Sequence, residues 1–262
     1  MKHLSLAELI EKLESSPRVV GIFTTGTAAI KLNPESDIDL VIVLDKNSEG
    51  IKSIYTTIEN HFSDIFFFNV DFINKLKNEQ EIRGNSFDGM FADWLINGKI
   101  EYDPENILLA AKNEISKNQP LQKITSSEKR EFWIKINYNL IANLRYYNAK
   151  DALYHEALEL RLLYSTSEIF NAYLSFRNIP WRGEKFAIQY FKKNDSEMLS
   201  VFKKYTSSIS LEEKMKYYEN LLNLTFFGEY QKWGEDFVIP IATQEGNNAR
   251  QLRDFWNNLA GA

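Results

Sequence analysis

Two aspartates one residue apart, Asp37 and Asp39, carry the clearest chemical signal in this chain of 262 residues. They lie at the start of residues 38–44, an apolar and β-branched run that predicts a buried strand. Side chains alternate between the two faces of a strand, so both carboxylates point the same way, about 7 Å apart along it. Such a pair can share or bridge hard cations such as Mg²⁺, so the spacing predicts a metal site.

A short loop before this pair has the composition of a phosphate-binding turn. Gly26 and Thr27 come one residue after residues 19–24, which are predicted to form another strand. A glycine lets backbone N–H groups approach a phosphate closely, and the threonine hydroxyl adds a donor. A phosphate cradle beside two carboxylates is what phosphoryl transfer requires, namely positioning and neutralisation of charge. Taken alone, Gly26-Thr27 could equally be a tight turn between strands.

A third carboxylate is expected on the next strand, which the pattern predicts over residues 64–72. Asp71 is the candidate, because it follows a strongly apolar run. An aspartate in such surroundings is costly to bury without a partner, and a metal ion would be that partner. The alternative for Asp71 alone is a polar residue that caps the strand end.

Together these residues resemble the polymerase-β-like nucleotidyltransferases. The family pattern is Gly-Ser/Thr, a gap of nine to thirteen residues, Asp-x-Asp, and an acid flanked by hydrophobic residues on a later strand. The match covers roughly residues 19–72, with nine residues between Thr27 and Asp37. A catalytic half followed by a helical half is similar to the antibiotic-modifying branch, including aminoglycoside and lincosamide nucleotidyltransferases. Residues 28–31 depart from the family, which often has further Gly and Arg there.

The resemblance implies a reaction and a set of roles. Asp37, Asp39 and Asp71 would hold two Mg²⁺ ions, while Gly26 and Thr27 would bind the terminal phosphates of an NTP. An acceptor hydroxyl would attack the α-phosphorus in line and release pyrophosphate. ATP is the first-choice donor and an antibiotic hydroxyl the first-choice acceptor, so the expected product is an adenylylated small molecule.

Two further candidates lie in the second half of the chain. Residues 179–186 are similar to a family segment that presents a lysine and an aromatic residue to the cleft, which implies that Lys185 contacts the triphosphate. The alternative is that Lys185 only begins a helix. Glu159 is a candidate general base and shares a predicted helix with His155 and Glu156. The simpler reading of this cluster is a solvated acidic face paired with nearby basic residues.

The period of the hydrophobic pattern changes along the chain and predicts two domains. Residues 1–110 read as an α/β catalytic domain, a small mixed sheet flanked by helices, with residues 51–61 expected to be helical. Residues 111–262 read as an all-α helical bundle that binds the acceptor in the cleft between the two domains.

Composition excludes several classes of site and partner. The chain has no cysteine, which excludes disulfides, thiolate metal sites and thiol nucleophiles. With three histidines, a histidine-rich metal site is not expected. A net charge of −5 is a poor match for long nucleic acid, which requires clustered Lys and Arg. A negative net charge is more compatible with a small acceptor molecule. The N-terminal residues 1–18 read as an amphipathic helix and not a signal peptide, and residues 38–44 are too short to span a bilayer. We therefore expect a cytoplasmic protein without membrane contact, and a homodimer is one permitted state.

Two alternatives remain open at this point. The acceptor could be a protein side chain or a metabolite, because a helical domain of this size could bind either. From another class comes a non-catalytic nucleotide sensor or antitoxin-like module, which would bind Mg·NTP and release no pyrophosphate. Three retained carboxylates argue against the sensor, because a site without turnover has no reason to keep them.

Overall fold

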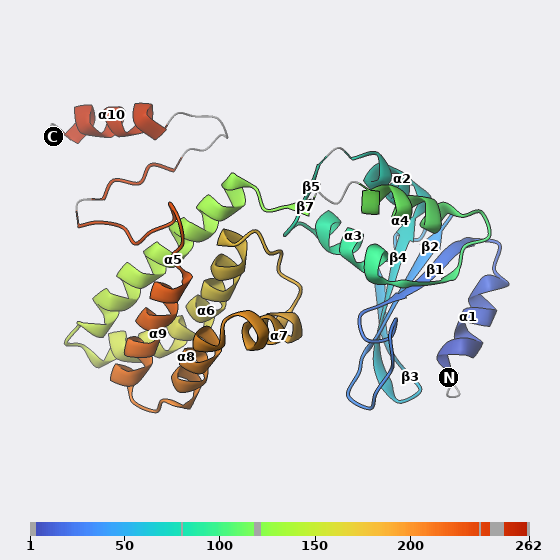
Figure 1. Ribbon diagram of the computed structural model, residues 1–262, viewed down its shortest axis with the longest axis horizontal. Helices are drawn as coiled ribbons and strands as arrows, with labels where there is room; N and C mark the ends of the chain where they lie inside the picture. Colours follow the sequence, from blue (N-terminus) through green and yellow to red (C-terminus); the bar gives the residue numbers. More distant parts are fainter. Residues whose placement is uncertain (1–3, 80, 118–121, 236, 242–248, 261–262) are drawn as a thin grey trace.

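Two lobes make up the part of the chain that the computed structural model describes, which is residues 4–79, 81–117, 122–235, 237–241 and 249–260. An N-terminal α/β lobe is followed by a helical lobe, and Figure 1 shows them side by side. This arrangement confirms the predicted fold class, a small mixed sheet with helices followed by an all-α region.

The sheet of the α/β lobe has five strands in the order β3-β4-β2-β1-β6. Strands β2 and β4 run parallel, whereas the other neighbouring pairs are antiparallel. The sheet is therefore mixed, as predicted. The strands are β1 (Val19–Thr25), β2 (Ile38–Leu44), β3 (Ser53–Ile58), β4 (His61–Asn69) and β6 (Lys99–Tyr102).

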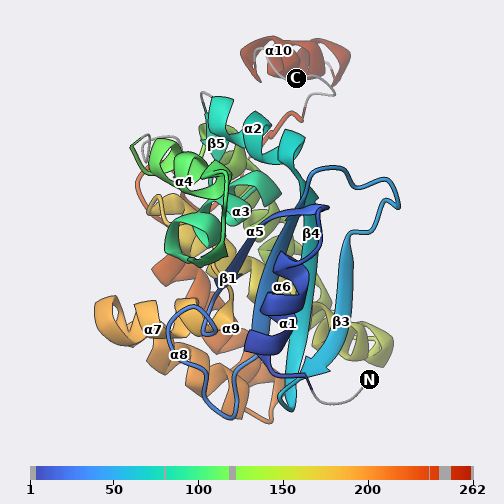
Figure 2. The same cartoon turned by 90° about the vertical axis from the view of Figure 1, so that its right-hand side faces the viewer.

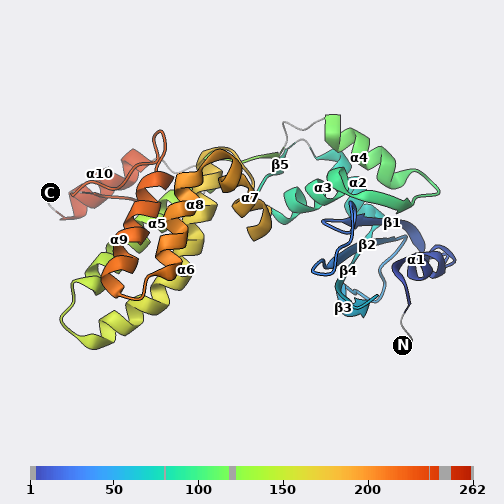
Figure 3. The same ribbon diagram turned by 60° about the horizontal axis from the view of Figure 1, so that its bottom comes forward.

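Alternation along the central strands supplies two apolar faces. Val41 packs into a cluster with α2 (Val70–Asn78), α3 (Phe87–Asn97) and α4 (Ile107–Lys117). Its neighbour Ile42 faces the opposite side, where the apolar residues of α1 (Leu6–Glu14) cover the sheet. Figure 2 shows α1 running along one side of the strands, and Figure 3 shows α2, α3 and α4 on the other. The two layers hold the strand ends that carry the acidic residues.

The predicted helix over residues 51–61 is wrong, because this segment forms β3 and the turn into β4. The strand sequence Ser-Ile-Tyr-Thr-Thr-Ile is rich in β-branched and aromatic residues, which favour strands. Glu59 and Asn60 adopt positive φ values of 50° and 67°. Two consecutive residues of this kind form the tight turn that joins antiparallel strands.

The strand predicted over residues 64–72 ends at Asn69, three residues early. The Asn69 side chain accepts a hydrogen bond of 3.0 Å from the Phe72 N–H and caps α2, which starts at Val70. Asp71 consequently lies in the first turn of a helix, and this difference decides its relation to the site.

Helix α4 crosses the expected domain boundary between residues 110 and 111. Its buried side chains Leu108, Ala111 and Ile115 all belong to the cluster under the sheet. The whole helix is therefore part of the α/β lobe. The short strands β5 (Ile82–Arg83) and β7 (Gln122–Lys123) pair in parallel where the chain passes between the lobes.

From Ser126 onward the named elements are helices. The helices between Ser126 and Thr225 share a core that includes Leu162, Phe191 and Tyr218, which are fully or almost fully buried. The helices are α5 (Ser126–Tyr147), α6 (Ala152–Phe176), α7 (Glu184–Asn194), α8 (Ser196–Ser207), α9 (Leu211–Thr225) and α10 (Ala249–Ala260). Helix α10 stands apart from the bundle, at the end of the molecule away from the sheet (Figure 1). Among the described residues, the length and apolar character needed for a membrane crossing do not occur together in any helix.

Candidate active site

Asp39 and Asp64 lie side by side on neighbouring strands. Asp39 in β2 is in register with Asp64 in β4, and on its other side with Thr25 in β1. Residues in register on adjacent strands share a face, and the strands are about 4.8 Å apart. Asp37 stands two residues before Asp39 and belongs to the same face. Three aspartates therefore gather at one end of the sheet.

Asp71 is not brought to this group. It is exposed in the first turn of α2, beyond the opposite end of β4. Asn69, where β4 ends, is five residues from Asp64, which at strand spacing is roughly 17 Å. The structure therefore groups Asp64, and not the expected Asp71, with Asp37 and Asp39. A signal for Asp64 was present in the sequence, because it precedes the apolar run of β4 much as Asp39 precedes that of β2.

The aspartates raise one another's affinity for protons. Burial, followed by the charges of Asp37 and Asp64, raises the pKa of Asp39 to about 6, while Lys185 acts in the opposite direction. Burial and the charge of Asp37 also raise the pKa of Asp64. The Oδ1 atom of Asp64 is buried without a hydrogen-bond partner. An unpaired buried carboxylate oxygen is unfavourable, and a bound cation would relieve it.

Gly26 lies directly against the Asp39 carboxylate. Its φ of +61° is in the left-handed region, and a Cβ at this position would be 2.8 Å from Asp39 Oδ2. The loop that follows is held by the Thr27 carbonyl, which accepts hydrogen bonds from the N–H groups of Ile30 and Lys31 at 3.1 and 2.9 Å. The structure therefore places the Gly26-Thr27 backbone beside the acids, where only glycine fits without strain.

Lys185 reaches the same group from the helical lobe. It lies in the first turn of α7, and its Nζ atom is 3.5 Å from Asp37 Oδ1. The ammonium group is largely exposed, so the ion pair itself contributes little to stability. Its importance is positional, because it puts a cation of the helical lobe next to carboxylates of the sheet.

Contacts just before α7 hold this lysine in place. Arg182 forms an ion pair with Asp93 of α3 at 3.0 Å and donates to the Gly84 carbonyl at 3.1 Å. The Trp181 N–H donates to Asn85 Oδ1 at 2.9 Å. These groups belong to the α/β lobe, so the chain entering α7 is attached to it immediately before Lys185.

Comparison with known protein families identifies the domain that contains this site. Residues 6–101, from α1 to β6, match the family model of the nucleotidyltransferase domain. This part of the chain is a nucleotidyltransferase domain. The matched region contains Gly26, Thr27, Asp37, Asp39 and Asp64, and it confirms the resemblance of the sequence to this superfamily. The activity class is accordingly nucleotidyl transfer.

Other comparisons add little about activity. A solved structure, a nucleotidyltransferase-like protein from Exiguobacterium sibiricum 255-15, is similar at 10% sequence identity with a TM-score of 0.44. The likeness covers 84% of this chain and 73% of that one, and at this level it has no bearing on the reaction. The sequence matches no curated protein.

Glu159, the candidate base, lies far from the nucleotidyltransferase domain's acids. Its Oε2 atom pairs with Lys214 Nζ of α9 at 2.6 Å. Along α6 it stands 16 residues before Ser175, which accepts a hydrogen bond of 3.1 Å from Asn85 of the α/β lobe. Sixteen residues of helix span roughly 24 Å. The structure therefore keeps Glu159 within the bundle.

The donor set of the nucleotidyltransferase domain suits a hard cation. Among the described residues, no group of three His, Asp or Glu side chains stands close enough to form a ready metal cage. The carboxylates that could move together to bind an ion are those of Asp37, Asp39 and Asp64. Mg²⁺ prefers carboxylate and phosphate oxygens as ligands. The unpaired Oδ1 atom of Asp64 fits such a ligand.

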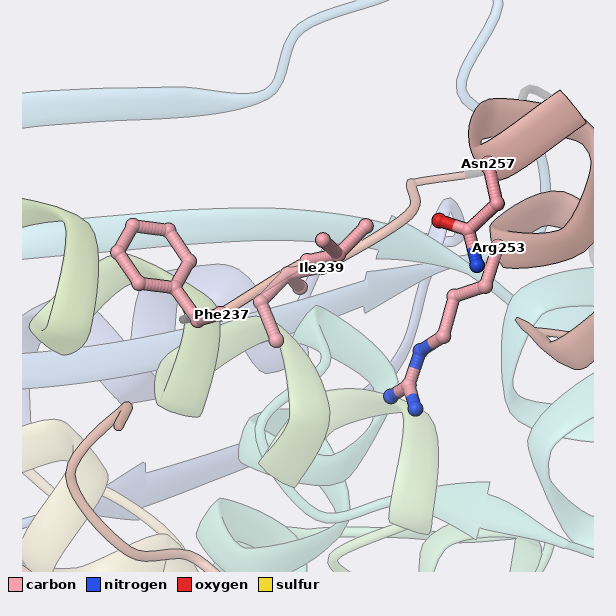
Figure 4. A pocket seen from close by; sticks show the side chains of 5 residues that line it. Phe237, Ile239, Arg253 and Asn257 are labelled. Atoms are coloured by element: carbon pink, nitrogen blue, oxygen red, sulfur yellow. The ribbon is translucent and has the colours of Figure 1, made fainter. Parts of the chain in front are cut away.

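Two surface pockets lie away from the acids. One, of about 350 Å³, is formed between the extended segment at Phe237 and Ile239 and the α10 side chains Arg253 and Asn257 (Figure 4). The other, of about 290 Å³, is lined by residues of α5 together with Glu229 and Tyr230. Neither includes an aspartate of the sheet, so the candidate active site rests on strand register and side-chain contacts.

Proposed function

We propose that this protein transfers a nucleoside monophosphate, AMP from ATP in the first instance, to a hydroxyl of a small molecule. Pyrophosphate is the second product. The observation that carries the proposal is the alignment of Asp39 and Asp64 at one register of β2 and β4 within a nucleotidyltransferase domain. Asp37 and Lys185 complete the group.

Asp37, Asp39 and Asp64 are the proposed ligands for Mg²⁺, with two ions expected from the resemblance. The cations would neutralise charge on the phosphates and lower the pKa of the acceptor hydroxyl. The raised pKa of Asp39 supports this assignment, because carboxylates that repel one another are stabilised when a cation is placed between them.

The terminal phosphates bind on the β1 side of the acids. Gly26 brings backbone N–H groups close to Asp39, and the Thr27 hydroxyl can donate beside them. Lys185 can exchange its contact with Asp37 for a phosphate oxygen, a stronger partner that carries more charge. The helical lobe thereby contributes to nucleotide binding.

The acceptor hydroxyl attacks the α-phosphorus from the side opposite to the leaving pyrophosphate. A bond forms between the acceptor oxygen and phosphorus, the bond to the β-phosphate oxygen breaks, and the hydroxyl proton leaves to a base. Asp64 is the proposed base in place of Glu159, because it lies beside Asp39 at the end of the sheet, whereas Glu159 is paired with Lys214 in the helical lobe.

A transfer assay tests the proposal. Purified protein is incubated with Mg²⁺, α-labelled ATP and pooled aminoglycosides and lincosamides, with Asp39→Asn in parallel, and labelled product and pyrophosphate are measured. Labelled product in the wild type alone is the expected result. Mg²⁺-dependent ATP binding without transfer to this pool points to another acceptor or to a sensor. Absence of any Mg²⁺-dependent NTP binding contradicts the proposal.

A further inference from the structure

Two exposed aromatic rings stack on the sheet of the α/β lobe. Tyr55 in β3 and Phe62 in β4 have ring centroids 6.2 Å apart and an angle of 9° between their planes. Tyr55 is 65% exposed and Phe62 is 59% exposed. Single exposed apolar side chains are common on protein surfaces. A parallel pair of half-exposed rings is a larger and flatter apolar area, and this pair lies next to the acids of the candidate site.

The pair continues the row of acids across the sheet. Tyr55 is in register with Asp64, Asp64 with Asp39, and Asp39 with Thr25, so the four residues share one face across β3, β4, β2 and β1. Phe62 is in register with Thr57, two residues along from Tyr55, and belongs to that face as well. The aromatic pair therefore lies next to Asp64, on the side away from Gly26.

The geometry of in-line transfer indicates on which side of the acids the acceptor lies. In the proposed reaction, Gly26 beside Asp39 and Lys185 beside Asp37 would hold the pyrophosphate near β1 and Asp37. In-line transfer requires the attacking oxygen on the opposite side of the α-phosphorus, which is the side of β4 and Asp64. The acceptor must then lie over β4 and β3, where Tyr55 and Phe62 are exposed.

We propose that Tyr55 and Phe62 form the acceptor-binding platform, and that the acceptor is a hydroxylated compound with a flat, carbon-rich ring. Stacking on the two rings would orient the molecule and leave a hydroxyl directed at the acids beside Asp64. This inference rests on the proposed function, because the acceptor side is defined by where pyrophosphate leaves.

Binding of two probes tests the platform. The affinities of 4-nitrophenyl β-D-glucopyranoside, which carries one flat aromatic ring, and sorbitol, an acyclic polyol without one, are measured by ligand-observed NMR with Mg²⁺ and a non-hydrolysable ATP analogue present. The wild type should bind the glucoside more tightly than sorbitol. Tyr55→Ala and Phe62→Ala should each weaken glucoside binding about fivefold or more, as expected for one lost stacking contact. Tyr55→Phe should retain it.

Ile54→Ala is the matched control, because Ile54 is an exposed apolar residue of the same strand on the opposite face. It should leave glucoside binding unchanged. The proposal is overturned if the wild type binds the two probes equally or does not bind the glucoside. It is also overturned if Ile54→Ala loses as much glucoside binding as Tyr55→Ala and Phe62→Ala.

Two further readouts identify a different occupant. If Tyr55→Ala weakens binding of the ATP analogue and spares the glucoside, the rings hold the nucleobase and the proposal is wrong. If Tyr55→Ala instead changes the mass measured by sedimentation, the rings bind a second copy of the chain and the proposal is again wrong. Failure of the proposed function is seen separately, as absent Mg²⁺-dependent binding of the ATP analogue in the wild type.

Discussion

Asp39 and Asp64 lie at the same register of the parallel strands β2 and β4, with their side chains on one face of the sheet. Each follows the start of its strand and is succeeded by buried apolar residues, so the backbone of a rigid element fixes each carboxylate. Rigid placement of charged groups is what phosphoryl transfer requires of a protein.

Replacing Gly26 should affect activity more than stability. Gly26→Ala places a residue with φ of +61° against Asp39 Oδ2, whereas Gly50→Ala has a similar φ of +64° and nothing within 4 Å. Both variants should lose about 1 kcal/mol of unfolding free energy from the backbone. Gly26→Ala alone should also lose transfer activity, measured with α-labelled ATP. Equal activity in the two variants would show that the approach to Asp39 is unimportant.

The stability of the metal-free protein should depend on Asp39 and pH. Its pKa is raised from 3.8 in the unfolded chain to about 6 in the folded one. The folded state therefore binds the proton more tightly, and this stabilisation is full below pH 4 and is lost as pH rises through 6. The upper limit is about 3 kcal/mol, reduced by solvent because Asp39 is partly exposed.

Thermal unfolding of the wild type and Asp39→Asn in chelator, from pH 4.5 to 8, measures this dependence. The melting temperature of the variant should rise relative to that of the wild type across the window. Added Mg²⁺ at pH 7.5 should stabilise the wild type more than the variant. A difference that does not change with pH contradicts the assignment.

Lys185 should act on nucleotide affinity. Lys185→Met removes the cation next to Asp37 and should raise the KM for ATP roughly tenfold, with little change in fold, because the side chain is largely exposed. Lys192→Met, an exposed lysine in the last turn of the same helix, serves as the control and should behave like the wild type. Equal KM values for the two variants would remove Lys185 from the site.

Arg182 should act through Lys185. Asp93→Asn breaks the ion pair that attaches Arg182 to α3 and should also raise the KM for ATP. In a Lys185→Met background the same change should have little further effect on KM, because the group it positions is already gone. Additive effects in this double-mutant cycle would show that the ion pair acts on the protein in another way.

Local patterns in the sequence predicted much of this architecture. The apolar, β-branched run over residues 38–44 predicted a strand, and Asp37 and Asp39 were correctly expected to share its face. The mixed sheet and the helical second half were confirmed. These features depend on side-chain period, which is a local property. The nearness of Lys185 to the acids came only from the family resemblance.

Local pattern offers both Asp64 and Asp71 as the third acid, one at each end of the same apolar run, and does not choose between them. Selecting Asp64 over Asp71 requires the register between β2 and β4, which is set by long-range pairing, and the end of β4, which is set by the Asn69 cap. Residues 51–61 were misread because Ile51, Ile54, Tyr55 and Ile58 recur at the spacing of one helix face, and the turn at Glu59 and Asn60 carries no glycine to mark it. The ion pair of Glu159 with Lys214 fits the simpler reading of an acidic face paired with basic residues. Helical spacing alone does not reveal which end of α6 lies nearest the α/β lobe.

The most direct test compares Asp64→Asn with Asp71→Asn. Both remove one negative charge from nearby positions in the sequence, but only Asp64 stands beside Asp39. Mg²⁺-dependent binding of ATP and transfer of α-label should be measured in both variants and the wild type. We predict that Asp64→Asn loses transfer by about 100-fold or more and weakens Mg²⁺-dependent binding, while Asp71→Asn behaves like the wild type. Normal transfer in Asp64→Asn, or an equal loss in Asp71→Asn, would contradict the account.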